Sequence, residues 1–221
     1  MSVIDVLQQR KSVRAYLDKE VPKNTIINIL EAAKMSPSGV NMQPFDVCVV
    51  SGNKKTTLEN KMLELFDKGK KEKMDYQYYP QEWIEPYKSR RKATGLLMYQ
   101  TLGINKEDKI KQLQQWRKNY QAFGAPVVLY FFIDPILEKG SYLDYGMFLQ
   151  SIMLTATELG LGCCPMASLA EYPSIVKNEL NIAKEKILLC GIALGYEDTN
   201  APINSYKTDR VALEEFTKFY D

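Results

Sequence analysis

The predicted fold is built around the run Val127-Val128-Leu129-Tyr130-Phe131-Phe132-Ile133, which contains no charged residue. An apolar stretch of this length, without alternating polar positions, is typical of a strand buried on both faces. Two further strands are predicted along the chain. One runs from Phe45 to Ser51, where Ser51-Gly52-Asn53 closes it, and the other runs from Leu188 to Gly195.

Helical segments surround these strands. The segment from Asp144 to Leu159 is apolar almost all round, which predicts a helix buried on most sides. Gly160 and Gly162 are expected to end it in a turn. Because helices alternate irregularly with only three or four strands, and no glycine-rich turn follows the first strand, the pattern favours an α+β fold over a doubly wound nucleotide-binding fold. We therefore expect a sheet wrapped by helices.

Two helices are predicted near the N-terminus. Ser2 and Asp5 have the spacing of a capping pair, so the first helix is expected to begin there and to end near Arg10. The second is expected to have Asn24 as its N-cap and to stop before Pro37. The apolar positions that the two helices place on one face are Val3, Val6 and Leu7 in the first and Ile26, Leu30 and Ala33 in the second.

Length and composition restrict the class of protein. The chain has 221 residues, 45% of them hydrophobic. This length and composition favour a single domain that spans residues 1–221. The net charge is only +2, so no overall field directs the protein to nucleic acid or to an anionic membrane. The apolar runs are far shorter than the roughly 20 residues of a membrane span. Four cysteines without CxxC spacing, in a chain without histidine, favour reduced thiols in the cytoplasm and no structural metal.

The absence of histidine also restricts the chemistry. The chain lacks the side chain whose ordinary pKa lies nearest neutrality, so proton transfer falls to other groups or a bound cofactor does the work. We favour a cofactor because three separated stretches provide suitable binding groups. These stretches are Arg10-Lys11-Ser12-Val13-Arg14, Pro37-Ser38-Gly39-Val40-Asn41-Met42-Gln43-Pro44 and Gly160-Leu161-Gly162-Cys163-Cys164-Pro165-Met166-Ala167-Ser168.

The first stretch has the character of an anion site. Arg10, Ser12 and Arg14 alternate, so in an extended segment their side chains point the same way toward one phosphate. Lys207 and Arg210, late in the chain, are candidates to complete the cage. The alternative is that these cations offset the dipole at the C-terminus of a helix.

The second stretch offers a hydroxyl and two amides, from Ser38, Asn41 and Gln43, on a loop held by prolines at both ends. An ordinary helix-to-strand loop with a local turn bond is the alternative. In the third stretch the small residues Ala167 and Ser168 would let backbone N–H groups approach a flat ring, although a simple tight turn would have the same composition. We interpret Cys163 and Cys164, which lack a histidine partner, as core residues.

Cations for a phosphate, polar groups for a ribityl chain and close backbone approach to a ring are together the parts of an FMN site.

Residues 66–123 differ in character from the rest of the chain, since lysines, arginines and aromatic residues are concentrated there. We interpret this region as a helical surface insertion. It is either a solvated helix face or a lid that covers a substrate.

The order of these motifs resembles the FMN-dependent nitroreductase family over essentially the whole chain. The motifs are Arg-x-Ser-x-Arg near residue 12, Pro-Ser-x-x-Asn-x-Gln-Pro near 40, Gly-Leu-Gly-x-x-Pro near 162 and Gly-x-Ala-Leu-Gly-Tyr at 191–196. The middle section is similar to the nitrobenzoate-reductase-like branch. That similarity rests on Tyr79-Pro80-x-x-Trp83, Pro86-Tyr87, Arg90-Arg91, Gly124-Ala125-Pro126 and Leu143-Asp144-Tyr145-Gly146.

The resemblance implies an α+β sandwich with a mainly antiparallel central sheet, forming an obligate homodimer with FMN at its interface. It assigns the phosphate and ribityl end to the first stretch and the late cations, and it assigns the second stretch to the partner chain. Ala167 would offer its backbone N–H to flavin N5. The implied cofactor-binding residues are Arg10, Lys11, Ser12, Arg14, Pro37, Ser38, Gly39, Asn41, Gln43, Pro165, Met166, Ala167, Ser168, Lys207 and Arg210.

The resemblance also implies the reaction. NADH or NADPH would reduce the flavin, and a nitroaromatic or quinone would then be reduced in a ping-pong cycle that needs no side chain as an obligatory acid or base. The residues expected to shape the acceptor pocket are Tyr76, Trp83, Tyr87, Arg90 and Arg91. Alternatives are another flavin reduction on the same scaffold, such as dehalogenation or enone reduction, and a non-catalytic flavin-binding or redox-sensing module.

Overall fold

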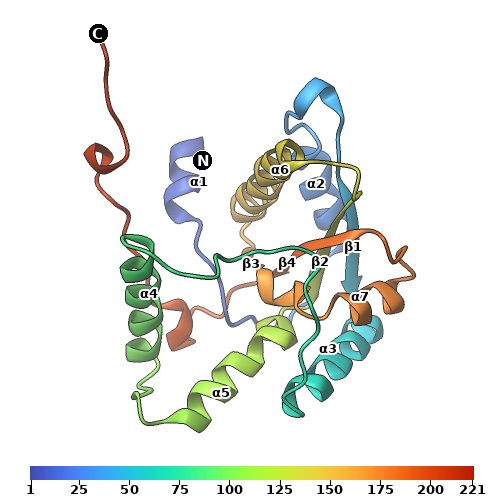
Figure 1. Ribbon diagram of the computed structural model, residues 1–221, viewed down its shortest axis with the longest axis vertical. Helices are drawn as coiled ribbons and strands as arrows, with labels where there is room; N and C mark the ends of the chain where they lie inside the picture. The colour runs from blue at the N-terminus through green and yellow to red at the C-terminus, as the bar shows by residue number, and fades with distance from the viewer.

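The structure, a computed structural model, describes residues 1–221. Its centre is a four-stranded sheet with the strand order β1-β2-β4-β3, and all three neighbouring pairs are antiparallel (Figure 1). The strands are β1 (Asp46–Ser51), β2 (Val127–Ile133), β3 (Gly162–Met166) and β4 (Ile187–Gly195).

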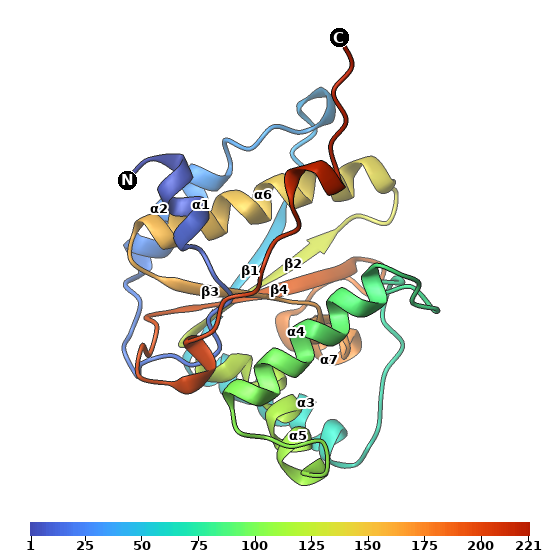
Figure 2. The same cartoon turned by 90° about the vertical axis from the view of Figure 1, so that its left-hand side faces the viewer.

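Helices cover both faces of the sheet. Helices α1, α2 and α6 lie on one side, and α3, α5 and α7 lie on the other (Figure 2). The α-helices are α1 (Val3–Gln9), α2 (Lys23–Ala33), α3 (Gly52–Asp67), α4 (Tyr87–Thr101), α5 (Lys109–Arg117), α6 (Lys139–Glu158) and α7 (Pro173–Leu180). Short 3-10 segments are η1 (Gly39–Asn41), η2 (Lys118–Gly124), η3 (Ala167–Ala170), η4 (Pro202–Asn204) and η5 (Leu213–Glu215).

The burial of β2 on both faces explains why its sequence does not alternate between apolar and polar residues. All seven of its residues are buried, because alternate side chains enter two different cores. Val127, Leu129, Phe131 and Ile133 pack with α2 and α6, whereas Val128, Tyr130 and Phe132 pack with α3 and α7. The α+β architecture, with an antiparallel sheet between helical layers, is confirmed.

Three predicted strands are confirmed within one residue at their ends, but β3 was not predicted. Gly162 is predicted to lie in a turn, whereas it begins a strand that pairs with β4. The short segment contains Pro165, which cannot donate a backbone hydrogen bond. Proline is tolerated there because β3 is at the edge of the sheet.

The helix boundaries agree with expectation at the first helix and differ at two others. Ser2 and Asp5 form the capping box that begins α1. Asn24 is not the cap of α2, because that helix already begins at Lys23 after Pro22, whose ring fixes φ. Helix α6 begins at Lys139, five residues before the predicted start, with the polar first turn that sequence periodicity leaves undefined.

The segment between α3 and α4, residues 68–86, contains no helix and is fastened to the body by its first half. Lys177 on α7 donates to both carboxylate oxygens of Asp75, at 2.9 and 3.0 Å, and Asp75 also accepts from the Leu188 N–H at 2.9 Å. The Tyr76 hydroxyl donates to the Leu189 carbonyl at 2.7 Å. Helix α4, which follows, has no buried residue.

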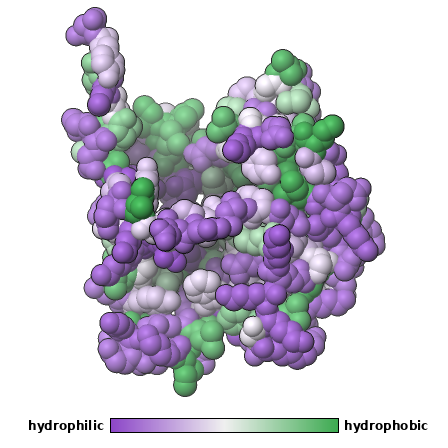
Figure 3. Space-filling view, viewed as in Figure 1, coloured by the Kyte–Doolittle hydropathy of each residue, from purple (hydrophilic) through white to green (hydrophobic).

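Helix α1 and the C-terminal tail are among the places where apolar side chains remain on the surface. Helix α1 buries only Val6 of its predicted apolar face and leaves Val3 and Leu7 exposed. Hydrophobic residues gather over α1 in the space-filling view (Figure 3). The C-terminal tail extends away from the body beyond η5 and carries exposed Phe219 and Tyr220. No helix is both long and apolar enough to cross a membrane.

Candidate functional site

The segment from Arg10 to Arg14 lies along the free edge of β3. The Val13 N–H donates to the Cys163 carbonyl at 3.0 Å, next to a parallel bridge between Ser12 and Cys163. The Val13 side chain is 2% exposed and enters the core. In an extended segment the flanking side chains point the other way, so Arg10, Ser12 and Arg14 share the outward side, as their alternation predicts.

This contact depends on a glycine. A Cβ built on Gly162 would lie 2.6 Å from Cγ2 of Val13, closer than real side chains approach, and the Val13 Cβ lies only 3.0 Å away. The absence of a side chain at Gly162 therefore lets the cation-bearing segment lie against β3.

We expect Gly162→Ala to lower the free energy of unfolding by about 1–3 kcal/mol, the usual cost of overpacking a buried contact. Urea denaturation measures this cost. Gly140→Ala is the control, because a Cβ there meets no atom within 4 Å. Equal stability of the two variants would contradict the described packing of Val13.

A cavity of about 240 Å³ opens beside this segment. Five cationic side chains and no carboxylate line it, together with four hydroxyl-bearing residues. The lining residues are Arg10, Lys11, Ser12, Arg14, Thr94, Tyr206, Lys207, Thr208 and Arg210. The structure thus brings the first predicted stretch together with the predicted late cations, Lys207 and Arg210, across more than 190 positions of sequence.

The five cations are not equally available to a ligand. Lys11 forms an ion pair with Glu197 at 2.7 Å and also donates to the Asn204 carbonyl at 2.7 Å, so its charge is largely compensated. Arg14 donates to the Tyr206 hydroxyl at 3.0 Å and retains further N–H groups. Arg10 lines the cavity and forms neither a hydrogen bond nor an ion pair through its side chain.

The remaining two cations lie on the late segment after η4. Lys207 donates to the Gln8 carbonyl at the end of α1, and Arg210 donates to Thr208 Oγ1 and to the Thr208 carbonyl, both at 3.0 Å. Their charges have no carboxylate partner. The late segment therefore adds uncompensated positive charge to the cavity.

Several site residues could not be chosen from sequence. Asn204 is buried and fastens the two segments together, since its side chain accepts from Arg14 N at 2.8 Å and donates to the Ala15 carbonyl at 2.8 Å. Tyr206 and Thr208 flank Lys207, which is the one sequence feature that points to them. Thr94 comes from α4 and has no such feature.

The second predicted stretch lies elsewhere in the molecule, and none of its residues lines the cavity. Ser38 accepts a bond from the Gln43 N–H at 2.9 Å, so the local turn considered as the alternative is present. The Gly39 N–H donates at 3.2 Å to the buried carboxylate of Asp144 on α6. Pro37, Asn41 and Gln43 are exposed, so the loop presents its polar groups to its surroundings.

The third stretch divides into buried and accessible parts. Pro165 is exposed on the edge strand, Met166 is buried, and Ala167 and Ser168 are half-buried at the start of η3. The neighbouring Cys163 and Cys164 are core residues, as predicted. Burial raises the pKa of Cys163 to about 12 and raises that of Cys164, so neither is a thiolate near neutral pH. Only Pro165, Ala167 and Ser168 of this part of the third stretch are therefore accessible to a ligand.

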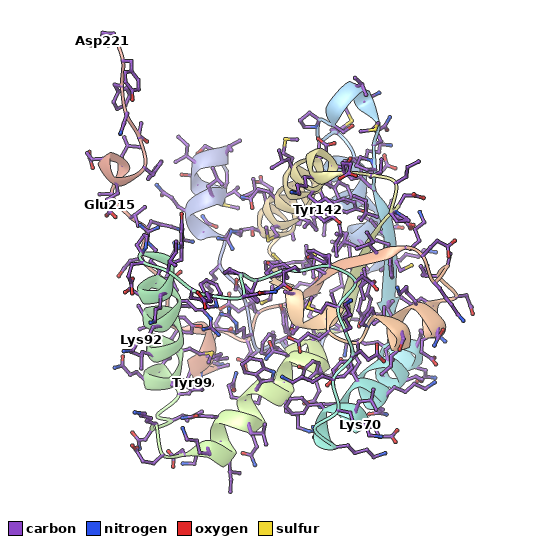
Figure 4. All side chains as sticks on the ribbon, viewed as in Figure 1. Lys70, Lys92, Tyr99, Tyr142, Glu215 and Asp221 are labelled. Carbon is purple, nitrogen blue, oxygen red and sulfur yellow. The ribbon has the colours of Figure 1, made fainter.

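The candidate acceptor residues are only partly grouped. The Arg91 guanidinium lies 4.9 Å from the centre of the Trp83 ring, and Arg90 pairs with Glu215 of the tail at 3.3 Å. Figure 4 shows Glu215 on the tail close to the start of α4. Tyr87 is exposed at the start of α4. Tyr76 faces β4 instead, and its burial raises the pKa of its hydroxyl.

Known proteins share both the sequence and the fold. A sequence profile of the nitroreductase family matches residues 7–196. A 4-nitrobenzoate reductase of Pseudomonas putida is 35% identical over 214 residues, which is 97% of this chain and 93% of that protein. A chloronitrobenzene nitroreductase of Comamonas testosteroni is 32% identical over 217 residues, covering 97% and 95%.

A solved structure agrees with the sequence relatives. The FMN and NADPH-dependent nitroreductase NfnB from Sphigopyxis sp. strain HMH superimposes with a TM-score of 0.96 and 34% identity, covering 100% of both chains. These matches extend over the whole chain. They therefore include the cation-bearing segment, its cavity and the antiparallel sheet. The protein belongs to the nitroreductase family.

Proposed function

We propose that this protein is an FMN-dependent NAD(P)H oxidoreductase that reduces nitroaromatic or quinone acceptors, and that its cationic cavity binds the FMN phosphate. One observation carries the proposal: five cations converge on a cavity of about 240 Å³ whose lining contains no carboxylate. When bound, FMN supplies hydride chemistry between NAD(P)H and the acceptor.

The residues present fit a phosphate ester. Arg10 and Arg14 offer guanidinium groups, which bind phosphate oxygens through two parallel hydrogen bonds. Ser12 and Thr208 add hydroxyl donors on the same cavity. Lys11 contributes less, because Glu197 already neutralises it. The cavity therefore has both the charge and the donors that a phosphate requires.

We propose that the third stretch faces the flavin ring through its backbone. Met166 buries its side chain, and Pro165 has no N–H, so Ala167 and Ser168 are the residues with both a donor and partial exposure. Small side chains at these two positions leave room for close approach of a planar group.

We also propose a homodimer in which the loop carrying Pro37, Ser38, Gly39, Asn41 and Gln43 completes the site of a second copy. This loop does not reach the cavity of its own chain. Exposed apolar residues on α1 and on the tail support a subunit interface (Figure 3). The four free cysteines fit a reducing compartment, the cytoplasm. Sedimentation of the purified protein tests the dimer, and a monomer at micromolar concentration would refute it.

Steady-state turnover tests the proposed reaction. The FMN-loaded protein is expected to oxidise NADPH or NADH with 4-nitrobenzoate, nitrobenzene or a benzoquinone as acceptor. Turnover restricted to halogenated phenols or enones would instead identify another reduction on the same scaffold. Tight FMN binding without oxidation of NAD(P)H by any acceptor would identify a non-catalytic flavin module.

We propose that residues 76–91, in the surface region 66–123, shape the acceptor pocket as part of a lid. Arg91→Ala is expected to raise KM for 4-nitrobenzoate by about tenfold or more, the loss of one charge-assisted contact. KM for nitrobenzene, which has no carboxylate, should change little. Lys92→Ala, an exposed neighbour on α4, is the control. Equal effects of Arg91→Ala on the two acceptors would remove Arg91 from carboxylate recognition.

A further inference from the structure

A second and larger cavity, of about 730 Å³, lies between the end of α3, the residues that follow it and α5. It shares no lining residue with the cationic cavity. Lys70, after α3, and Tyr99, on α4, lie on opposite sides of α5 in Figure 4, and both line this cavity. It is therefore a separate feature of the molecule.

One wall of the second cavity is aromatic. Phe66 and Tyr172 both pack against Tyr120, with ring centres 4.8 and 5.3 Å from the Tyr120 ring. Trp116 donates its indole N–H to the Tyr120 hydroxyl at 3.2 Å, which fixes the indole. Trp116 is nevertheless 49% exposed and lines the cavity, and no other aromatic ring of the chain stacks on it.

The charged residues around the second cavity favour an anion. Lys70, Lys71 and Lys109 are exposed, and none of them forms an ion pair. Two carboxylates also line the cavity, and each accepts a hydrogen bond from a neutral donor, which leaves its negative charge in place. Glu72 accepts from the Ser174 N–H at 2.8 Å, and Glu171 accepts from the Tyr120 hydroxyl. Three lysines and two carboxylates give the lining a formal net charge of +1, and the lysines, which have no ion-pair partner, are the groups free to face an anion.

We propose that the second cavity binds a planar aromatic carboxylate of two or three fused rings. The ring system would stack on Trp116 against the aromatic wall, and the carboxylate would face the three lysines. The cavity volume of about 730 Å³ lies in the size range of sites for drug-sized ligands. This volume is larger than a ligand with a single ring requires. This site goes beyond the proposed nitroreductase reaction and does not depend on it.

Fluorine NMR of the FMN-loaded protein labelled with 5-fluorotryptophan tests the proposal. The chain has only two tryptophans, Trp83 and Trp116, and Trp83→Phe assigns their resonances. Titration with 2-naphthoate, which is not a nitro compound or a quinone, should shift the Trp116 resonance saturably. The neutral 2-naphthamide should bind at least about tenfold more weakly, because it cannot pair with the lysines. A shift of the Trp83 resonance alone would place the ligand in the acceptor region and overturn the proposal.

Lysine variants complete the test. The triple variant Lys70→Ala/Lys71→Ala/Lys109→Ala should raise the Kd for 2-naphthoate by about tenfold or more. Lys73→Ala removes an exposed lysine of the same segment that does not line the cavity, and it should leave Kd unchanged. Equal affinity for the acid and the amide, or an unchanged Kd in the triple variant, would refute the site. These readouts remain valid even if the protein reduces no acceptor.

Discussion

Replacing Arg10 and Arg14 with alanine is expected to weaken FMN binding by about two to four orders of magnitude. Each guanidinium contributes charge-assisted hydrogen bonds of about 1.5–3 kcal/mol, and each loss corresponds to roughly a tenfold to hundredfold rise in Kd. Arg10 should account for much of the effect, because its side chain has no competing partner within the chain. Fluorescence titration of apoprotein with FMN measures Kd.

The control variants separate this effect from the general charge of the protein. Lys92→Ala removes an exposed cation on α4 that does not line the cavity, and it should leave Kd unchanged. Lys11→Ala should weaken binding less than Arg10→Ala, because Glu197 already neutralises Lys11. If the double arginine variant folds and retains FMN with the parental affinity, the cavity is not the phosphate site.

Replacing Asp75 with alanine is expected to lower the free energy of unfolding by about 3–5 kcal/mol, the usual cost of leaving a buried charge without its partner. Lys177 is 7% exposed, and Asp75 provides two of its four hydrogen-bond acceptors and the only negative charge among them. The substitution also removes the acceptor of the Leu188 N–H. Urea denaturation followed by circular dichroism measures the loss.

A double variant tests the cause of this loss. In Asp75→Asn/Lys177→Met the buried charge disappears, and the amide can still accept from Leu188, so the cost should be smaller than that of Asp75→Ala alone. Lys68→Ala breaks the exposed pair with Glu64 and should cost less than about 1 kcal/mol. If Asp75→Ala were no more harmful than Lys68→Ala, the ion pair would not be what fastens residues 68–76 to the body.

The parts of the fold that the sequence predicts have a local signal, either continuous burial, as in β2, or a capping box, as in α1. Strand β2 is apolar throughout because it lies between two cores, so its limits follow from composition. Strand β3 depends on its place at the sheet edge, where Pro165 is tolerated, and a single sequence does not reveal that place. The start of α6 lies in a polar turn that hydrophobic periodicity does not define.

The same distinction holds for the candidate site. The alternation of Arg10, Ser12 and Arg14 predicts a shared side chain direction, and pairing with β3 produces it. The compensation of Lys11 by Glu197, and the arrival of Thr94 from α4, are consequences of tertiary packing between distant segments. Such contacts between distant segments cannot be predicted from the types of neighbouring residues.

If the cationic cavity holds FMN, the purified protein is yellow, and its visible absorbance spectrum shows this without any further probe. We expect the bands of bound flavin, which bleach when NADPH or NADH is added without oxygen and return when a nitroaromatic is supplied. A protein that stays colourless after incubation with excess FMN and removal of the unbound excess would contradict this expectation.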